Sequence, residues 1–385
     1  MNLRLKRLDV LRAIAIFFVL FLHTGLPLFR RMGWTGVDLF FVLSGFLISG
    51  LLFSEYKKRG AISFKRFFIR RGLKIYPSFY LMIATTIGVE LGLKLHLTLG
   101  DCLREILFVQ NYRFGIWQHT WSLAVEEHFY IALPMLLLCL ARVSRDKTNP
   151  FRAIPWAFGI VAIGCLASRF LRIELNPGLT FDWHRVTNPT HLRIDALFFG
   201  VLLGYVHHFH PGRMEEFLGS RWIRALAIIL VPLLLWTAFF TRQMNLFLAT
   251  FGLTFLYLGF GLLLMLSLHV RGIVPHPLQR PVSLLGTGLA YVGMYSYSIY
   301  LWHLPFASWA PGVLRRLFGI HMNQTQFTLF FILGGVVFGI AMSKLVEYPV
   351  LRLRDRIFPA MQTSPRPQGE SAMAEITSSA SSSTA

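Results

Sequence analysis

The sequence predicts an all-α, polytopic integral membrane protein with about ten transmembrane helices. Its 385 residues are 55% hydrophobic and only 15% charged, and the mean hydropathy of +0.55 exceeds what a water-soluble domain of this length shows. The apolar residues also gather in stretches close to the ~20 residues that a helix needs to cross a bilayer. The ten stretches cover residues 9–29, 34–53, 75–93, 121–141, 153–171, 191–208, 225–241, 245–268, 288–311 and 326–346.

The basic residues predict how these helices are oriented. The formal net charge is +20, and Lys and Arg are expected to concentrate in cytoplasmic loops. With a cytoplasmic N-terminus, 24 of them fall in inside segments and 10 in outside segments. We therefore expect both termini in the cytoplasm. No basic surface interleaved with aromatic residues lies outside the predicted spans, so we expect no nucleic-acid partner.

The remaining segments divide the chain into a membrane domain over 1–348 and a cytoplasmic tail over 349–385. The tail turns to Ser, Ala, Thr and Pro, which predicts disorder from about residue 360. The stretch 95–120 is apolar enough to dip into the membrane or lie along its surface. Three cysteines, two of them inside predicted spans, indicate neither a disulfide framework nor a CxxC metal site.

Ionisable residues inside the first apolar stretch are the strongest functional signal. Arg12 and His23 are eleven positions apart, almost three helical turns, so they share a helix face about 16 Å apart along the axis. Titratable side chains within a bilayer cost free energy and mark cavities or pathways. Arg12 and His23 are therefore candidate functional residues.

The predicted topology brings further ionisable groups to the outer third of the bilayer. They are Asp38, Glu126, Arg193, Asp195 and His303. A histidine oriented by a carboxylate is what proton transfer needs, so we predict catalytic roles for His23, Glu126 and Asp38. The alternative is that these groups pair with one another and hold the helices together. Glu127 is expected on the helix surface or facing the lipid headgroups.

A second constellation lies on the cytoplasmic side, in KKRGAISFKRFFIRRGLKIYPSF. An ordinary positive-inside loop explains most of its cations. Arg70 and Arg71 differ, because they stand at the start of the third apolar stretch beside Tyr76, where a guanidinium fork can bind phosphate. His207, His208 and His210 have no carboxylate or Cys partner nearby, which favours an interfacial patch over a metal site.

Seven sequence blocks resemble, in order and over the whole membrane part, the acyltransferase 3 family of bacterial membrane-bound O-acyltransferases. The blocks are RLDVLRAIAIFFVLFLH, GVDLFFVLSGFLIS, FFIRRGLKIYP, TWSLAVEEHFYIALP, RIDALFFGVLLG, YSIYLWHLP and VEYPVLRLRD. The resemblance implies transfer of an acyl group, commonly acetyl, from a cytoplasmic acyl-CoA such as acetyl-CoA to a hydroxyl of a sugar or cell-envelope glycan. It implies no tightly bound cofactor and a place in the bacterial cytoplasmic (inner) membrane.

Residue by residue, the family's Arg and His fall on Arg12 and His23, its paired arginines on Arg70 and Arg71, and its glutamate on Glu126. We therefore expect Arg12, Arg70 and Arg71 to bind the donor's phosphates, and His23, oriented by Glu126 or Asp38, to act as general base. The residues expected to line the site are Ser44, Tyr76, Trp121, Tyr130, Arg193, Asp195 and His303. An acyl-enzyme on His23 or Ser44 stays open.

Two further possibilities remain from the sequence. A transporter or flippase for a lipid-linked glycan would also place Arg, Asp and His at mid-membrane, although such proteins commonly show paired halves with broken helices, and none is visible here. Nothing after residue 348 is long enough for an added hydrolase-like domain. The chain is therefore expected to finish the transfer itself or to hand it to a separate extracytoplasmic partner.

Overall fold

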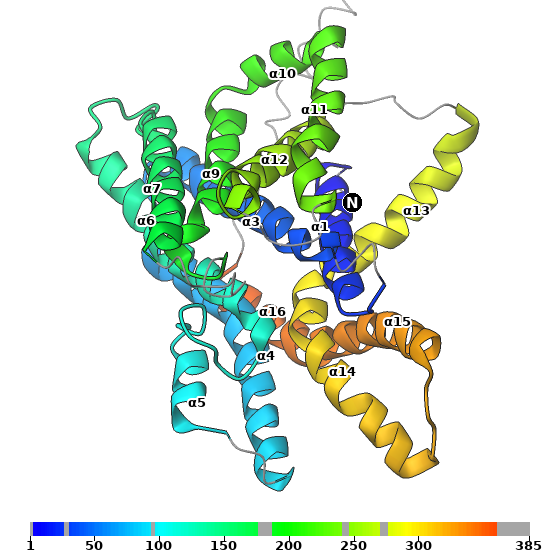
Figure 1. The fold of residues 1–385 in the computed structure, drawn as a ribbon. Coiled ribbons are helices and arrows are strands. Elements are labelled where there is room, and N and C mark those ends of the chain that lie inside the picture. Colours follow the sequence, from blue (N-terminus) through cyan, green and yellow to red (C-terminus); the bar gives the residue numbers. More distant parts are fainter. Residues whose placement is uncertain are drawn as a thin grey trace, which may run out of the picture.

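A computed structural model describes residues 3–26, 31–93, 97–175, 187–240, 246–269 and 276–359. Across these ranges the regular structure is helical throughout, with no strand, which confirms the all-α prediction (Figure 1). The predicted disordered tail from about residue 360 lies outside the described residues.

Each of the ten predicted stretches contains a helix. The long helices are α1 (Leu3–Leu22), α3 (Gly36–Arg59), α4 (Phe64–Leu93), α6 (Trp121–Val143), α7 (Ile154–Glu174), α9 (Ile194–Phe209), α11 (Arg221–Phe240), α12 (Leu253–His269), α13 (His276–Met294), α14 (Ser296–Phe318) and α15 (Gln324–Met342). The shorter α-helices are α5 (Leu99–Ile106), α10 (Pro211–Gly219) and α16 (Tyr348–Ile357). Short 3-10 turns are η1 (Gly33–Thr35), η2 (Gln118–Thr120) and η3 (Thr190–Leu192), and π-helical turns are η4 (Leu248–Gly252) and η5 (Ser343–Glu347).

Not every helix is long and apolar enough to cross a bilayer. Five of those in the described ranges are, and a sixth is added if α10 and α11, which meet at 90°, count as one bent span. The five cover Gly33–Arg59, Gln118–Val143, Ile154–Glu174, Leu248–His269 and Gln324–Ile357. The remaining helices include α9, which is apolar but has only 16 residues, and ones with a basic N-terminal part, such as α4. The chain is thus a membrane protein, and the predicted count of ten spans stays unconfirmed.

Two predicted spans do not end where the helices of the structure end. The first was expected over 9–29, but α1 ends at Leu22, and Gly25 follows with φ +79°, a left-handed conformation that stops a helix. His23 therefore lies just past the helix end and not within it. The expected span 288–311 is broken at Tyr295, where α13 ends and α14 leaves in a different direction (Figure 1).

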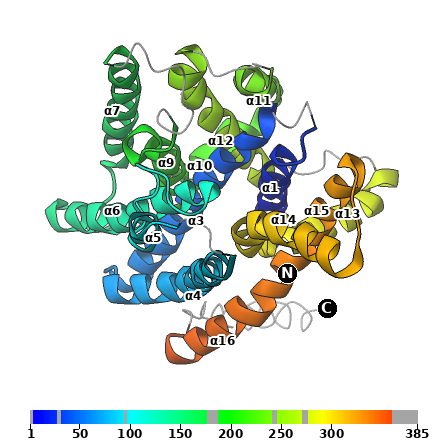
Figure 2. The same cartoon turned by 60° about the horizontal axis from the view of Figure 1, so that its bottom comes forward.

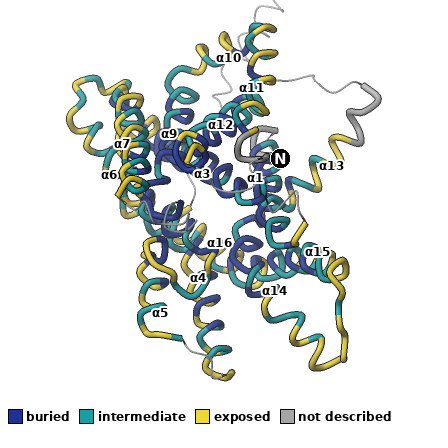
Figure 3. Tube along the Cα trace, viewed as in Figure 1, coloured by how far each residue is buried: buried dark blue, intermediate teal, exposed yellow. Residues whose placement is uncertain are grey.

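The helices α1, α3, α9 and α12 form the buried centre of the molecule (Figure 3). Glycines allow α3 and α9 to approach closely: a Cβ added at Gly45 would lie 1.9 Å from the Leu197 carbonyl oxygen, and one at Gly200 would lie 2.3 Å from that of Val42. Small residues let membrane helices pack in this way. Figure 2 shows α16 crossing beside α4, away from this centre.

Candidate functional site

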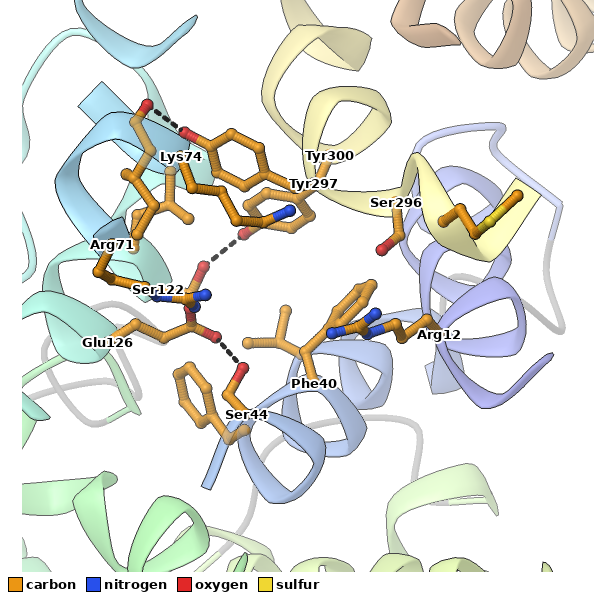
Figure 4. A pocket seen from close by; sticks show the side chains of 15 residues that line it. Arg12, Phe40, Ser44, Arg71, Lys74, Ser122, Glu126, Ser296, Tyr297 and Tyr300 are labelled. Atoms are coloured by element: carbon orange, nitrogen blue, oxygen red, sulfur yellow. Dashed lines mark hydrogen bonds between the residues drawn. The ribbon is translucent and has the colours of Figure 1, made fainter. Parts of the chain in front are cut away.

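Three neighbouring cavities lie between α1, α3, α4, α6 and α14. The central cavity, of about 100 Å³, is shown in Figure 4. Its polar lining consists of Arg12, Ser44, Arg71, Lys74, Ser122, Glu126, Ser296, Tyr297 and Tyr300. Helices that are far apart in the sequence thus contribute cations, hydroxyls and one carboxylate to a single space.

Glu126 is the centre of a hydrogen-bond network on one wall of this cavity. Its carboxylate accepts from the Ser44 hydroxyl at 2.9 Å and from the Tyr130 hydroxyl at 2.6 Å. Arg71 donates to the Tyr130 hydroxyl, and its guanidinium carbon lies 4.3 Å from the centre of the Tyr130 ring. Charge-assisted hydrogen bonds and a cation–π contact together fix the Arg71 side chain at the cavity wall (Figure 4).

The two other cations of the central cavity are paired with acidic residues. Lys74 Nζ lies 3.1 Å from Glu347, which also accepts from the Ser298 hydroxyl at 2.7 Å and the Ser343 hydroxyl at 2.9 Å. Arg12 Nη1 lies 3.0 Å from Asp9 Oδ1, one helical turn earlier in α1. These contacts orient the cations at the edge of the cavity.

A larger cavity of about 450 Å³ adjoins the central one on the side of the basic segment between α3 and α4. Its charged lining consists of Glu55, Lys58, Arg66, Arg70, Arg71, Lys74 and Arg354. Arg71 and Lys74 line both this basic cavity and the central cavity. Helix α16 lies at its edge, where Asp355 accepts from Arg70 at 3.1 Å and the Phe358 carbonyl accepts a second Arg70 hydrogen bond.

The outer cavity, of about 90 Å³, lies beyond the central one and shares Val37 and Tyr300 with it. Its polar and aromatic lining includes His23, Trp34, Gln118, His119, Trp121, Thr187 and Arg193. Behind His23 the buried ring of His303 lies 5.3 Å away between ring centroids, and the His119 ring lies 4.9 Å from that of His303. Two imidazoles, those of His23 and His119, therefore line this cavity, and that of His303 lies behind them.

Two buried ion pairs account for the other predicted charges. Arg193 donates to Asp38 at 2.6 Å, and Arg169 donates to both oxygens of Asp195 at 2.7 Å each. All four side chains are at most 2% exposed. Buried charges that pair in this way avoid the cost of lying uncompensated in an apolar interior.

The structure thus separates the predicted catalytic residues into different environments. Asp38 is engaged by Arg193, and Glu126 by Ser44 and Tyr130, so neither carboxylate is placed as the orienting partner of His23. Asp38 and Asp195 do not line any of the three cavities. Asp38 and Asp195 were expected to lie in one cluster with His23. In the described residues, Asp38 is instead held by Arg193 and Asp195 by Arg169.

Among the residues predicted to line the site, Ser44 lies at the central cavity and Trp121 and Arg193 at the outer one. Tyr130 stands behind Glu126, and His303 behind His23. Tyr76 donates its hydroxyl hydrogen bond to Glu127 at 3.0 Å, away from the cavities.

The prediction for Glu127 was wrong. Its side chain is 8% exposed and accepts the Tyr76 hydrogen bond, so it faces α4 and not the lipid headgroups. Periodicity alone does not show which face of α6 is buried, because apolar residues lie on nearly all sides of this helix.

Several residues of the cavities were not singled out from the sequence. Lys74 follows Arg71 by three positions, which places both on one helix face, and this spacing was a usable signal. Tyr300 lies inside the YSIYLWHLP block, next to His303 in the helix. His119 carried no signal that distinguishes it from an ordinary polar residue near a helix end, and neither did Arg169, which lies outside the three cavities in the pair with Asp195.

Comparison with known proteins identifies the family. The model of the acyltransferase domain that bears the name acyltransferase 3 matches residues 5–345. The chain therefore belongs to the acyltransferase 3 family. No solved structure matches it.

Three relatives illustrate the similarity. The peptidoglycan O-acetyltransferase OatA of Listeria monocytogenes is 30% identical over 80% of this chain and 50% of its own length. "Putative O-acetyltransferase SACOL0978" of Staphylococcus aureus is 28% identical over 78% of this chain and 50% of its own. "Putative peptidoglycan O-acetyltransferase YrhL" of Bacillus subtilis is 29% identical over 77% of this chain and 48% of its own. The chain spans about half the length of these relatives, and none of them supports the transporter alternative.

Proposed function

We propose that this chain is a membrane O-acetyltransferase that moves an acetyl group from a cytoplasmic acyl-CoA to a hydroxyl of a cell-envelope glycan. Family membership supports the acyl-transfer class, and the peptidoglycan O-acetyltransferases among its relatives support the glycan acceptor. The observation that carries the proposal is the row of three adjoining cavities. It links the basic cavity, through Arg71 and Lys74, with the central cavity and then, through Tyr300 and Val37, with His23.

The basic cavity suits the nucleotide part of the donor. Coenzyme A carries several phosphate charges, and arginine guanidinium groups bind phosphate oxygens bidentately. Arg66, Arg70 and Arg354 line the wide cavity of about 450 Å³, and Arg71 lines both this cavity and the narrower central one. In the proposed complex the phosphates stay at the wide end, and the thin, largely uncharged pantetheine arm passes Arg71 and Arg12 towards His23.

The outer cavity suits the chemical step. His23 removes the proton of the acceptor hydroxyl while the hydroxyl oxygen attacks the thioester carbonyl carbon. As the tetrahedral intermediate collapses, the carbon–sulfur bond breaks, the acetyl ester is left on the sugar, and His23 returns the proton to the departing thiolate. The hydroxyls of Ser122 and Tyr300, 2.6 Å apart, lie along this path. Tyr300 donates its proton to the His119 carbonyl at 2.6 Å, so Ser122 or Tyr300 becomes a donor to the oxyanion only by turning its O–H away from the present acceptor.

An acyl-enzyme remains a distinct route, and a specific contact favours Ser44 as its carrier. The Ser44 hydroxyl donates to the Glu126 carboxylate at the wall of the central cavity, which is the arrangement of a nucleophile beside a base. Incubating the protein with radiolabelled acetyl-CoA alone separates the routes. A covalent label that Ser44→Ala removes supports the acyl-enzyme, whereas direct transfer leaves the protein unlabelled.

The proposed function is tested with the purified protein in lipid nanodiscs, radiolabelled acetyl-CoA and peptidoglycan fragments as acceptor. We expect a base-labile acetyl ester on the sugar, and we expect His23→Ala to lower turnover by about 10²–10⁴-fold, as loss of a general base does. His321→Ala, which removes an exposed histidine that lines none of these three cavities, is the matched control. Near-normal turnover by a correctly folded His23→Ala protein excludes His23 as the base, and absence of acetyl transfer by the unmodified chain to these and other envelope glycans excludes the function.

A further inference from the structure

His303 is a fully buried histidine whose hydrogen-bonding state is determined by its surroundings. It lies on α14 with no exposed surface, and its Nδ1 is 2.5 Å from the Tyr300 carbonyl oxygen. A carbonyl oxygen only accepts, so Nδ1 must carry the proton. In a neutral imidazole, the other nitrogen, Nε2, then holds a lone pair that can only accept.

That lone pair lacks a donor within the described part of the chain. His303 Nε2 is buried without a hydrogen-bond partner, a situation that costs about 1–3 kcal/mol in a folded protein and that native structures avoid. The ring around it is fixed by packing against Tyr300 and Phe331, with ring centroids 5.6 Å and 6.4 Å away. His303 Nε2 is thus a hydrogen-bond acceptor in a fixed position, to which an N–H or O–H group can donate.

The His119 ring is the closer neighbour, at 4.9 Å, but its Nε2 proton is used on the Leu301 carbonyl and its Nδ1 only accepts. His23 is therefore the neighbouring ring that can supply a donor. The His23 and His303 ring centroids are 5.3 Å apart and the ring planes are tilted by 44°, with no hydrogen bond between the rings in the structure. This spacing allows about 3 Å, the length of a hydrogen bond, once a nitrogen of each ring is turned towards the other. His23 is half-buried and lies just past the C-terminal end of α1, and within the described residues no hydrogen bond holds its ring. The two carboxylates expected to orient His23 are engaged elsewhere, by Arg193 and by Ser44 with Tyr130.

We propose that His303 is the positioning residue of His23: its Nε2 accepts a hydrogen bond from one ring N–H of His23, so that the other ring nitrogen presents its lone pair to the outer cavity. This inference rests on the proposed role of His23 as the general base. An imidazole with a fixed tautomer does here what a carboxylate does in most histidine-based sites.

His119 extends the same arrangement to the cavity wall. Its Nε2 is 3.1 Å from the Leu301 carbonyl oxygen and therefore carries the proton, while its Nδ1 is buried and unpartnered among the described residues. His119 lines the outer cavity beside His23. In the proposed arrangement His119 Nδ1 is an acceptor for a second hydroxyl of the incoming sugar, next to the hydroxyl that His23 deprotonates.

Two variants of His303 separate positioning from packing. His303→Leu keeps an apolar side chain in the buried space but removes the acceptor, whereas His303→Gln retains a carbonyl oxygen as acceptor. We expect His303→Leu to lower kcat about 10- to 100-fold with KM for acetyl-CoA nearly unchanged, because misorientation of a base affects the chemical step. His303→Gln is expected to recover most of this loss, and His321→Leu is the control. Equal losses in the Leu and Gln variants, or none in the Leu variant, overturn the inference.

A second measurement is independent of activity and so distinguishes failure of this inference from failure of the proposed function. In protein labelled with ¹⁵N in its histidine rings, two-bond couplings report which ring nitrogen is protonated, and the His23 signal is the one that His23→Ala removes. We expect a single His23 tautomer in the unmodified protein and in His303→Gln, and a mixture of tautomers in His303→Leu. Identical His23 tautomer populations in the unmodified and Leu proteins overturn the inference even if both are active.

Discussion

Arg71 links the basic and central cavities and is the residue on which proposed donor binding depends most. Arg71→Ala is expected to weaken acetyl-CoA binding by about 1.5–3 kcal/mol, or on the order of 10- to 100-fold in Kd, because a guanidinium–phosphate contact is lost. Titration of acetyl-CoA by calorimetry measures this change. Arg213→Ala, at an exposed position on the same predicted side of the membrane, is the control. Unchanged donor affinity would move the nucleotide site elsewhere, with the 142–152 loop as the next place to test.

Asp38 illustrates how a predicted catalytic residue can have a structural role. Because Asp38 and Arg193 form a buried pair at 2.6 Å, Asp38→Ala leaves an uncompensated guanidinium and is expected to cost about 3–5 kcal/mol of stability. The double variant Asp38→Ala, Arg193→Ala should cost clearly less than the sum of the two single variants. Thermal unfolding in detergent measures all three.

The control for this cycle is Asp355→Ala, since Asp355 is 49% exposed and a surface ion pair contributes little. If Asp38→Ala abolishes acetyl transfer while unfolding at the same temperature as the unmodified protein, Asp38 acts in the chemistry and not in packing.

At the scale of elements, the connection between α4 and α6 is organised by one buried carboxylate. Glu105 on α5 accepts hydrogen bonds from the backbone of Ile116 and Trp117, each at 3.0 Å, and from the Thr120 hydroxyl at 2.9 Å. This segment ends at η2, which carries His119 into the outer cavity. Burial raises the pKa of Glu105 to about 7 from its ordinary value of 4.5.

This shift predicts how the stability of the segment depends on pH. Two states of the segment are compared: the folded one, in which Glu105 is buried, and a locally unfolded one, in which it is exposed to water. Below about pH 4.5 Glu105 is protonated in both states, and between pH 4.5 and 7 it is protonated only in the folded state. Stability is therefore greatest in acid and falls by about 3 kcal/mol as the pH rises to 7. We expect hydrogen exchange of residues 107–117, corrected for intrinsic rates, to be slower at pH 5 than at pH 7.5. Glu105→Gln should remove this difference, and an unaltered pH trend in that variant would contradict the assignment.

At the scale of the whole molecule, all proposed roles depend on which side of the membrane each cavity faces. A single apolar helix, α6, separates Gln118 from Thr148. With Cys102, Cys139 and Cys165 replaced by Ser, a cysteine at position 118 should react with an impermeant thiol reagent from outside, and one at 148 only after the membrane is opened. Labelling of both from the same side would contradict the topology. It would also remove the basis for placing the basic cavity on the cytoplasmic side.

Much of this protein follows from its sequence alone. Long apolar stretches cannot fold in water and must satisfy their backbone groups within helices, so the membrane class and the all-α fold follow from composition. The ordered blocks identify the family. Arg12 and His23, and the paired Arg70 and Arg71, are visible as candidate residues because ionisable side chains are unusual within or beside apolar stretches. The expectation that Arg12 and His23 share one helix face was wrong, since α1 ends at Leu22.

Only the tertiary structure decided which charges meet. Whether Asp38 pairs with His23 or with Arg193 depends on how α3 packs against the segment before α9. This packing is set by the glycines that let α3 and α9 approach closely. The contacting residues of the two helices are about 155 positions apart in the sequence. After the break at Tyr295, α14 begins at Ser296, and its His303 ring lies 5.3 Å from that of His23. Such pairings depend on distances of a few ångströms between helices that are distant in sequence, and periodicity within one helix carries no information about its neighbour.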